Sequence, residues 1–464
     1  MSNFIRLQKA LKKQGIAVTF QDGIYQFHNP HAHASVLLPA TLPLEEKAVR
    51  QLLAFAAVHV PGHSGHVCKA CATPDFHPGT IAPVGSIVAT TPDMVIPAAV
   101  GTDINCAVRL VRTGLTLAQL ETHKESLTRR LTRALLEDGR NIPVRSVAFA
   151  ALFDDGPTAW IDLLHRDGLW KHVDKDRLFA ETARAIGLNS FGGKRRYAPE
   201  AFTGTREIIR DPCLGTIGSG NHFVEFQIVD AILDRYAAYT AGLVPDEAVF
   251  MIHSGSRDVG FYVGQRWMDR ARAAWPDGIK HPESGLYGLT GELATEYAEA
   301  MGVAARYAWA NRVVLTEMIR ECLHAEFEDD RSALIVDVPH NVILQENGLN
   351  IHRKGATPAH EGDLALIPGS IGDYSYVVTG LGNTEWLSSC AHGAGRAIRR
   401  QALRAKRQYP GHELPWHCIT LREERRIEEA PAAYKRIGPV IEAQETAGMI
   451  SPVARLRPWM TFKA

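Results

Sequence analysis

Apolar runs rich in β-branched residues recur along this chain, and each ends abruptly in a loop of small or polar residues. Runs of this kind predict buried strands. Helical spacing of apolar positions instead marks 116–139 and 292–327, and a further helix is expected to start at Ala394 or Gly395. Strands interleaved with helices predict a mixed α/β fold, and no Ser/Gly linker separates the candidate site residues. We expect one catalytic domain over 1–464, with 1–60 as an N-terminal elaboration.

The least charged segment, TIAPVGSIVATTPDMVIPAAVGT at 80–102, raises the question of a membrane span. Three prolines and Asp93 divide it, so short buried strands and turns are expected instead. No secretion signal is read at the start of the chain. Seven cysteines, an odd number without such a signal, indicate reduced thiols and a cytoplasmic location.

Charge is balanced over the whole chain, with 51 Lys and Arg against 51 Asp and Glu, so net charge does not point to any class of partner. A local basic stretch, AIRRQALRAKR, follows His392 in SSCAHGAGR. A basic helix is usually a solvated face, but beside a phosphate-binding loop it could track a polyanion. This alternative concerns Arg396, Arg399, Arg400 and Arg404.

Chemically useful residues stand where the apolar runs end. Because strand-end loops at one sheet edge cluster in space, we expect a shared site. The residues are Asp103, Cys106, Asn221, His222, His253, His340, Asn341, Ser370, Ser375 and His392.

One carboxylate, one thiol and three imidazoles among these residues could hold two metal ions, provided that the cysteine sulfur bridges them. They are Asp103, Cys106, His222, His253 and His340. Five ligands for two ions leave open positions, as a catalytic site requires. Ligand softness alone favours zinc. A second possibility, a zinc site at Cys68 and Cys71 near His63 and His66, lacks the second ligand pair of a closed structural site.

In the strand expected near Asn221, side chains alternate, so Asn221, Phe223 and Glu225 share one face and His222 points to the other. Asn221 and Glu225 could bind a base, sugar or phosphate, or could be a polar strand face in solvent. The loops HSGSR, PGSIG and HGAGR permit close backbone approach to an oxyanion, although such loops often mark only a tight turn.

The chain also resembles a known family, the RtcB-type RNA ligases. The shared motifs are PDFHPG, VGTDINCAV, GSGNHF, HSGSR, HNV, HRKGATPA, PGSIG, SYVV, HGAGR, EAPAAYK and the terminal FKA, in family order from about residue 70 onward. Departures include Ala107 where relatives usually have glycine, Asp258 after HSGSR, and Arg399 where relatives often have serine.

The resemblance implies a single catalytic domain with β-sheets at the core and helices outside. It also implies two manganese ions, one held by Cys106, His253 and His340 and the other by Asp103, Cys106 and His222. It implies that His392 attacks GTP, the co-substrate, and carries GMP. It also implies a guanylate pocket and, for Arg396 and the basic segment after it, contact with RNA phosphates. The pocket residues are Asn221, His222, Phe223, Val224, Glu225, His340, Asn341, Pro368, Gly369, Ser370, Ile371, Ser375, His392, Gly393, Ala394, Gly395 and Lys463.

The substrates implied are RNA with a 3′-phosphate or 2′,3′-cyclic phosphate and RNA with a 5′-hydroxyl, joined in tRNA splicing or RNA repair. Dependence on an activating protein is left open, and no membrane partner is expected. Two alternatives remain. One is a dinuclear metal-dependent phosphoesterase in which His392 only binds phosphate, and the other is a non-catalytic RNA or nucleotide-binding protein.

Overall fold

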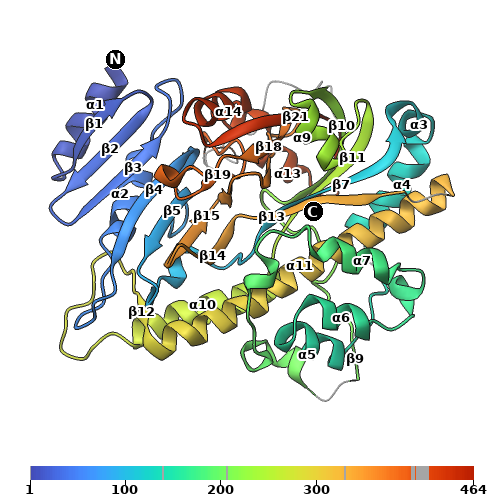
Figure 1. Cartoon of the computed structure of the whole chain (residues 1–464), viewed down its shortest axis with the longest axis horizontal. Coiled ribbons are helices and arrows are strands. Elements are labelled where there is room, and N and C mark those ends of the chain that lie inside the picture. The colour runs from blue at the N-terminus through green and yellow to red at the C-terminus, as the bar shows by residue number, and fades with distance from the viewer. Residues whose placement is uncertain (1, 138–139, 205–206, 329–330, 399–402, 404–416) are drawn as a thin grey trace.

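A computed structural model of the chain describes residues 2–137, 140–204, 207–328, 331–398, 403 and 417–464. In this part of the chain two large β-sheets lie side by side and helices pack around them (Figure 1). The predicted mixed α/β fold is therefore confirmed.

The first sheet has seven strands and contains the N-terminal part of the chain. Its neighbours pair antiparallel except β3 with β4, which run parallel. In spatial order the strands are β1 (Ala17–Gln21), β2 (Ile24–Asn29), β3 (Ala32–Leu37), β4 (Val67–His77), β5 (Val84–Thr90), β15 (Leu349–Lys354) and β14 (Asn341–Glu346).

The second sheet has eight strands, all from residue 107 onward. In spatial order they are β13 (Ala333–Pro339), β7 (Ala107–Thr116), β11 (Glu247–Ser254), β10 (Phe223–Ile232), β21 (Ile450–Lys463), β18 (Ser375–Gly380) and β17 (Leu364–Ile367), with β20 (His417–Thr420) parallel to β21. Three small two-stranded sheets pair β6 (Met94–Val95) with β12 (Leu289–Thr290), β8 (Val144–Arg145) with β9 (Ile208–Ile209), and β16 (Ala356–Pro358) with β19 (Ser389–Ala391).

Helix α11 (Gly291–Phe327) is the long central helix, running beneath the sheets beside α10 (Arg257–Ala273) in Figure 1. Its middle part is buried all round, as expected of a helix enclosed between layers. The remaining described helices are α1 (Ser2–Lys12), α2 (Glu46–Ala56), α3 (Leu117–Thr122), α4 (Lys124–Leu136), α5 (Ser146–Asp154), α6 (Pro157–Leu163), α7 (Lys175–Thr182), α8 (Glu200–Thr203), α9 (Arg235–Ala241), α13 (Glu423–Glu428) and α14 (Ile437–Thr446).

Two of the three helix predictions agree with the structure. The 292–327 prediction matches α11 closely, and the 116–139 segment is helical but divides at His123 into α3 and α4. The segment 80–102 forms β5, β6 and a short 3₁₀ turn, as predicted. Among the described residues, no helix combines the length and apolar character needed to cross a bilayer.

The helix expected to start at Ala394 or Gly395 is wrong for the described residues up to Ile398. Gly395 has a left-handed φ of +75°, and its carbonyl accepts from the Lys435 backbone N–H at 2.9 Å. The Ala397 and Ile398 N–H groups both donate to the Ala433 carbonyl. This backbone is therefore paired with a distant segment and not with its own next turn.

Candidate functional site

Four strands of the eight-stranded sheet bring the candidate ligands to one edge. Cys106 immediately precedes β7 and His340 immediately follows β13, while His253 lies near the end of β11. Ala107 pairs with both Ser254 and Pro339 across the sheet, so these strand ends are aligned. Phe223, the first residue of β10, pairs with His253, and this register places His222 beside the same edge.

The side chains converge as the sequence predicted. Cys106 Sγ lies 3.2 Å from both His222 Nε2 and His253 Nε2. His222 Nε2 is 3.0 Å from Asp103 Oδ2, and His253 Nε2 is 3.2 Å from His340 Nε2. The two groups of potential metal ligands found among the described residues are Cys106, His253 and His340, and Asp103, Cys106 and His222. Cys106 is common to both groups.

Burial sets the protonation of this cluster. It lowers the pKa of His253 and of His340 well below the usual range, so both imidazoles are neutral at neutral pH. Burial alone would raise the pKa of Asp103, but the charges of His222 and Lys354 outweigh it and keep this pKa low. Burial raises the pKa of the Cys106 thiol. A bound cation reverses that effect, because coordination deprotonates a thiol.

The donor set fits a pair of cations. Two neutral imidazole nitrogens 3.2 Å apart, those of His253 and His340, can share at most one proton, and the Cys106 sulfur stands beside them. A metal ion between these lone pairs would satisfy all three. Asp103 and His222 offer the same arrangement on the other side of the sulfur. The residues present therefore form a potential metal site, with two ligand groups that share Cys106.

Hydrogen bonds from helix α11 connect the segments that carry these side chains. The buried Arg312 guanidinium donates to the Asn105 carbonyl at 2.9 Å and to the Ser254 carbonyl at 3.1 Å. Its Nε donates to Asp337 of β13 at 3.0 Å. One side chain thus joins the loop of Asp103 and Cys106 to the strands of His253 and His340.

His392 lies next to the cluster, at the end of β19. Its ring centroid is 4.7 Å from that of His340. Its Nδ1 is 2.6 Å from Oδ2 of Asp75, a fully buried residue of β4. Thr73 donates to the other carboxylate oxygen at 2.5 Å. A carboxylate only accepts, so in the neutral ring Nδ1 carries the proton and Nε2 keeps its lone pair for other partners.

The segment that contains Lys435 holds Asp75 and the histidine loop together. Lys435 Nζ donates to the carbonyls of Pro74 and Phe76, on either side of Asp75, at 2.9 and 2.7 Å. Burial lowers the pKa of Lys435 to about 8. A Cβ added at Gly395 would lie 2.2 Å from the Asp75 carbonyl oxygen, so only glycine permits this approach.

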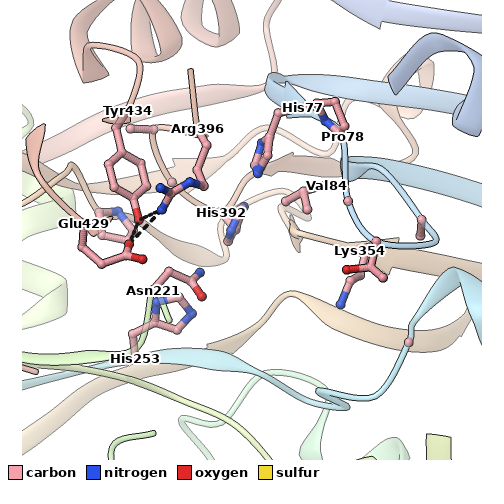
Figure 2. Close-up of a pocket in the computed structure, with 18 of the residues that line it drawn as sticks. His77, Pro78, Val84, Asn221, His253, Lys354, His392, Arg396, Glu429 and Tyr434 are labelled. Carbon is pink, nitrogen blue, oxygen red and sulfur yellow. Dashed lines mark hydrogen bonds and ion pairs between the residues drawn. The ribbon is translucent and has the colours of Figure 1, made fainter. Parts of the chain in front are cut away.

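A cavity of about 790 Å³ opens in front of His392 (Figure 2). Its lining includes His253 of the cluster and most of the residues that the resemblance assigned to a guanylate pocket. Those residues are Asn221, Phe223, Glu225, Pro368, Gly369, Ser370, Ile371, His392, Gly393, Ala394, Gly395 and Lys463. Burial raises the pKa of Glu225 to about 7.

The other residues assigned to that pocket do not line the cavity. Val224 faces the apolar core, as strand alternation predicts. Asn341 donates to the Asp103 carbonyl at 3.0 Å, beneath the ligand cluster. The Ser375 hydroxyl accepts from the Gly369 N–H at 3.2 Å and so supports the PGSIG loop from below. His222 and His340 belong to the ligand cluster.

The basic residues are only partly placed. Arg396 lines the cavity, but its guanidinium contacts Glu429 at 3.0 Å and the Glu428 carbonyl at 2.7 Å (Figure 2). Arg399, Arg400 and Arg404 lie outside the described residues. Of the departures from the family pattern, Ala107 opens β7, and Asp258 accepts from the Cys213 thiol at 3.2 Å.

The alternative zinc site is not assembled. Cys68 and Cys71 both lie in β4, where Cys68 is exposed and Cys71 is buried. Neither belongs to a potential ligand group within the described ranges.

Sequence reasoning did not find Asp75, Lys435 or Arg312. Asp75 and Lys435 belong to PDFHPG and EAPAAYK, which carried the resemblance without being given roles. Arg312 lies within a helix whose periodicity gives no sign of a function. In each case the role arises from a partner remote in the sequence: Asp75 contacts His392 across 317 positions.

Comparison with known proteins places these residues in context. The family described as tRNA-splicing ligase RtcB matches residues 56–464. A tRNA-splicing ligase RtcB of Methanococcus maripaludis is 33% identical over 436 residues, covering 84% of this chain and 87% of that protein. The protein of the same name from Thermococcus kodakarensis is 33% identical over 438 residues, with coverages of 83% and 85%. That from Archaeoglobus fulgidus is 32% identical over 468 residues, with coverages of 89% and 90%.

Proposed function

Because this chain belongs to the tRNA-splicing ligase RtcB family, we propose that it is an RNA ligase that uses GTP and Mn²⁺ in tRNA splicing or RNA repair. It joins an RNA 3′-phosphate, or a 2′,3′-cyclic phosphate after hydrolysis, to a 5′-hydroxyl. The observation that carries this proposal is the 2.6 Å contact between His392 Nδ1 and Asp75. It leaves Nε2 as a nucleophile beside a cluster able to bind two cations.

In the first step His392 Nε2 attacks the α-phosphorus of GTP. An N–P bond forms, the P–O bond to the β-phosphate breaks, and pyrophosphate leaves. Asp75 keeps the proton on Nδ1 and stabilises the positive charge that develops on the ring. Two manganese ions, when held by Asp103, Cys106, His222, His253 and His340, would offset the negative charge of the phosphates.

Two further transfers complete the ligation. An oxygen of the RNA 3′-phosphate attacks the phosphorus on His392, and the N–P bond breaks, which releases the free imidazole. The 5′-hydroxyl oxygen then attacks the activated 3′-phosphorus, loses its proton, and displaces GMP. The product is a phosphodiester that retains the phosphate of the 3′ end.

Recognition of GTP is assigned to one wall of the cavity. Phe223 offers a ring face for stacking, and Glu225 and Lys463 offer a carboxyl group and an ammonium. The PGSIG loop and Gly393 to Gly395 allow the phosphates to approach backbone closely. The reaction is expected in the cytoplasm, and an activating protein stays an open prediction.

The test is to incubate the protein with Mn²⁺ and GTP labelled on the α-phosphate and to look for acid-labile label on the protein. We expect label on the wild type and none on His392→Ala. His360→Ala is the matched control, because this histidine pairs with Glu346 at 3.4 Å and lies outside the cavity lining. An unlabelled wild type, or label retained in His392→Ala, would contradict the mechanism.

Adding RNA with a 3′-phosphate to a parallel incubation without GTP separates the alternatives. A phosphoesterase would release inorganic phosphate from RNA 3′-phosphate without GTP and without labelling. A non-catalytic binding protein would do neither.

A further inference from the structure

The cavity has a second wall to which the proposed reaction gives no role. In Figure 2, Asn221, which is assigned to GTP, lies on the same side of His392 as Glu429 and Tyr434. Pro78, Val84 and Lys354 lie on the other side of His392. The second wall is completed by Gly101, Thr102, Phe261, Gln265 and Met268.

Helix α10 contributes one continuous stripe to this wall. Phe261, Gln265 and Met268 follow one another at helical spacing, so they share one face of the helix. Phe261 is 61% exposed, although the helix as a whole packs against α11. Single exposed phenyl rings are common on protein surfaces, but this one borders the cavity that contains His392.

Helix α10, which carries this stripe, packs against the segment that the Lys354 ammonium approaches. A Cβ added at Gly264, between Phe261 and Gln265, would lie 2.7 Å from the Gly101 carbonyl oxygen, so α10 touches the 101–102 segment directly. A Cβ added at Gly101 would in turn lie 3.4 Å from Lys354 Nζ. Phe261 thus lies about one helical turn from Gly264, and Gly264 contacts the segment that Lys354 approaches.

Lys354 faces the cavity from this side. Figure 2 shows its amine directed toward the open space below Val84. Burial lowers the pKa of Lys354, while Asp103 and Cys106 act in the opposite direction. The wall thus combines a cation near the ligand cluster with an exposed aromatic ring farther out.

We propose that this second wall binds the terminal nucleotide of the RNA strand that carries the 3′-phosphate, with its base stacked on Phe261 and its phosphate facing Lys354. Stacking on an aromatic side chain is tolerant of sequence, as a ligase that joins different RNA ends requires. An ammonium is a common phosphate ligand. The assignment rests on the proposed function, because it places the second substrate opposite GTP with His392 between them.

The test compares Phe261→Ala with Tyr239→Ala. Tyr239 of α9 is 85% exposed and lies outside the cavity lining, so it controls for the loss of an exposed aromatic ring. Binding of a short single-stranded RNA with a 3′-phosphate is measured by fluorescence anisotropy with Mn²⁺ and without GTP. Labelling of the protein by GTP is measured in parallel.

We expect Phe261→Ala to weaken RNA binding about tenfold or more, in line with the contribution of one stacked base. Phe261→Trp should retain binding, Tyr239→Ala should leave it unchanged, and all three should accept label from GTP as the wild type does. Unchanged RNA affinity in Phe261→Ala, or an equal loss in Tyr239→Ala, overturns the assignment.

A second comparison tests the phosphate. The wild type should bind RNA ending in a 3′-phosphate more tightly than the same RNA ending in a 3′-hydroxyl, and Lys354→Met should remove the difference. A difference that persists in Lys354→Met places the phosphate elsewhere. Failure of the proposed function would show instead as absence of GTP label on the wild type, whatever the RNA affinities.

Discussion

The two large sheets contribute to the site in different ways. The eight-stranded sheet presents candidate metal ligands at the aligned ends of its strands. Neighbouring strands hold these ends in register, and Arg312 of α11 joins the segments of Cys106, His253 and His340. The seven-stranded sheet instead contributes Asp75, from within a buried strand, and Lys354, from the end of β15. The eight-stranded sheet assembles the candidate metal ligands, and the seven-stranded sheet orients His392 through Asp75 and faces the cavity. The two functions should therefore be separable by mutation.

The largest effect on metal content and ligation is expected from Cys106→Ala. Its sulfur belongs to both potential ligand groups, so its loss should release both manganese ions and reduce ligation to background. Cys322→Ala, in α11 outside the ligand groups, is the control. Metal content is measured by mass spectrometry of the desalted protein. Retention of one ion in Cys106→Ala would mean that the sulfur does not bridge.

Asp75→Asn, unlike Cys106→Ala, should slow GTP labelling without releasing metal. The amide can donate to Nδ1 and so favour the tautomer in which Nε2 carries the proton, and loss of the orienting carboxylate in comparable triads costs about 10⁴-fold. We expect the rate of GTP labelling to fall by about 10³- to 10⁴-fold while metal content stays that of the wild type. If the metals are lost together with the labelling, the two sheets do not act separately.

Arg312→Lys tests whether the Arg312 guanidinium positions the candidate metal ligands. Lysine cannot reach two carbonyls and a carboxylate at once, and loss of a group that orients ligands typically costs about 10- to 100-fold in metal affinity. Arg109→Lys is the matched control, since Arg109 is equally buried and also pairs with Asp337, at 3.1 Å. Manganese titration followed by electron paramagnetic resonance should show weaker binding in Arg312→Lys alone. Equal weakening in both variants, at matched melting temperatures, would reduce Arg312 to a general structural role.

The smallest expected effect is the pH dependence of GTP binding at the wall of the cavity that is proposed to recognise GTP. The pKa of Glu225 is raised to about 7 by burial, so its ionised fraction rises about tenfold between pH 6 and pH 8. Only the ionised carboxylate can accept from both the N1–H and the exocyclic amino group of guanine, so the KM for GTP should fall by up to about tenfold over this range. Glu225→Gln should flatten this dependence. A wild-type KM that does not vary with pH would remove Glu225 from base recognition.

The difference between the two large sheets also explains which parts of the site could be predicted from the sequence. Each candidate ligand stands at the end of an apolar run, and strand ends at one edge converge, so the grouping of Asp103 with the cysteine and histidines followed from local pattern. The pairing of Asp75 with His392 depends on how two different sheets meet, and no local period encodes that.

The incorrect helix at Gly395 has a related cause. Within the described residues up to Ile398, the left-handed glycine and the backbone pairing with Ala433 and Lys435 prevent a helix from starting at the predicted residue. Local propensity is a weak prior where long-range backbone pairing is available.

The Arg312–Asp337 pair also implies how the protein should respond to ionic strength. Both side chains are 2% exposed, so mobile ions cannot screen the pair effectively. Binding of an RNA backbone, in contrast, releases condensed counterions and weakens steeply as salt rises. Concentrated salt should therefore release RNA from the protein while leaving the Arg312–Asp337 pair intact. The same protein molecules could then bind RNA again without a new supply of metal.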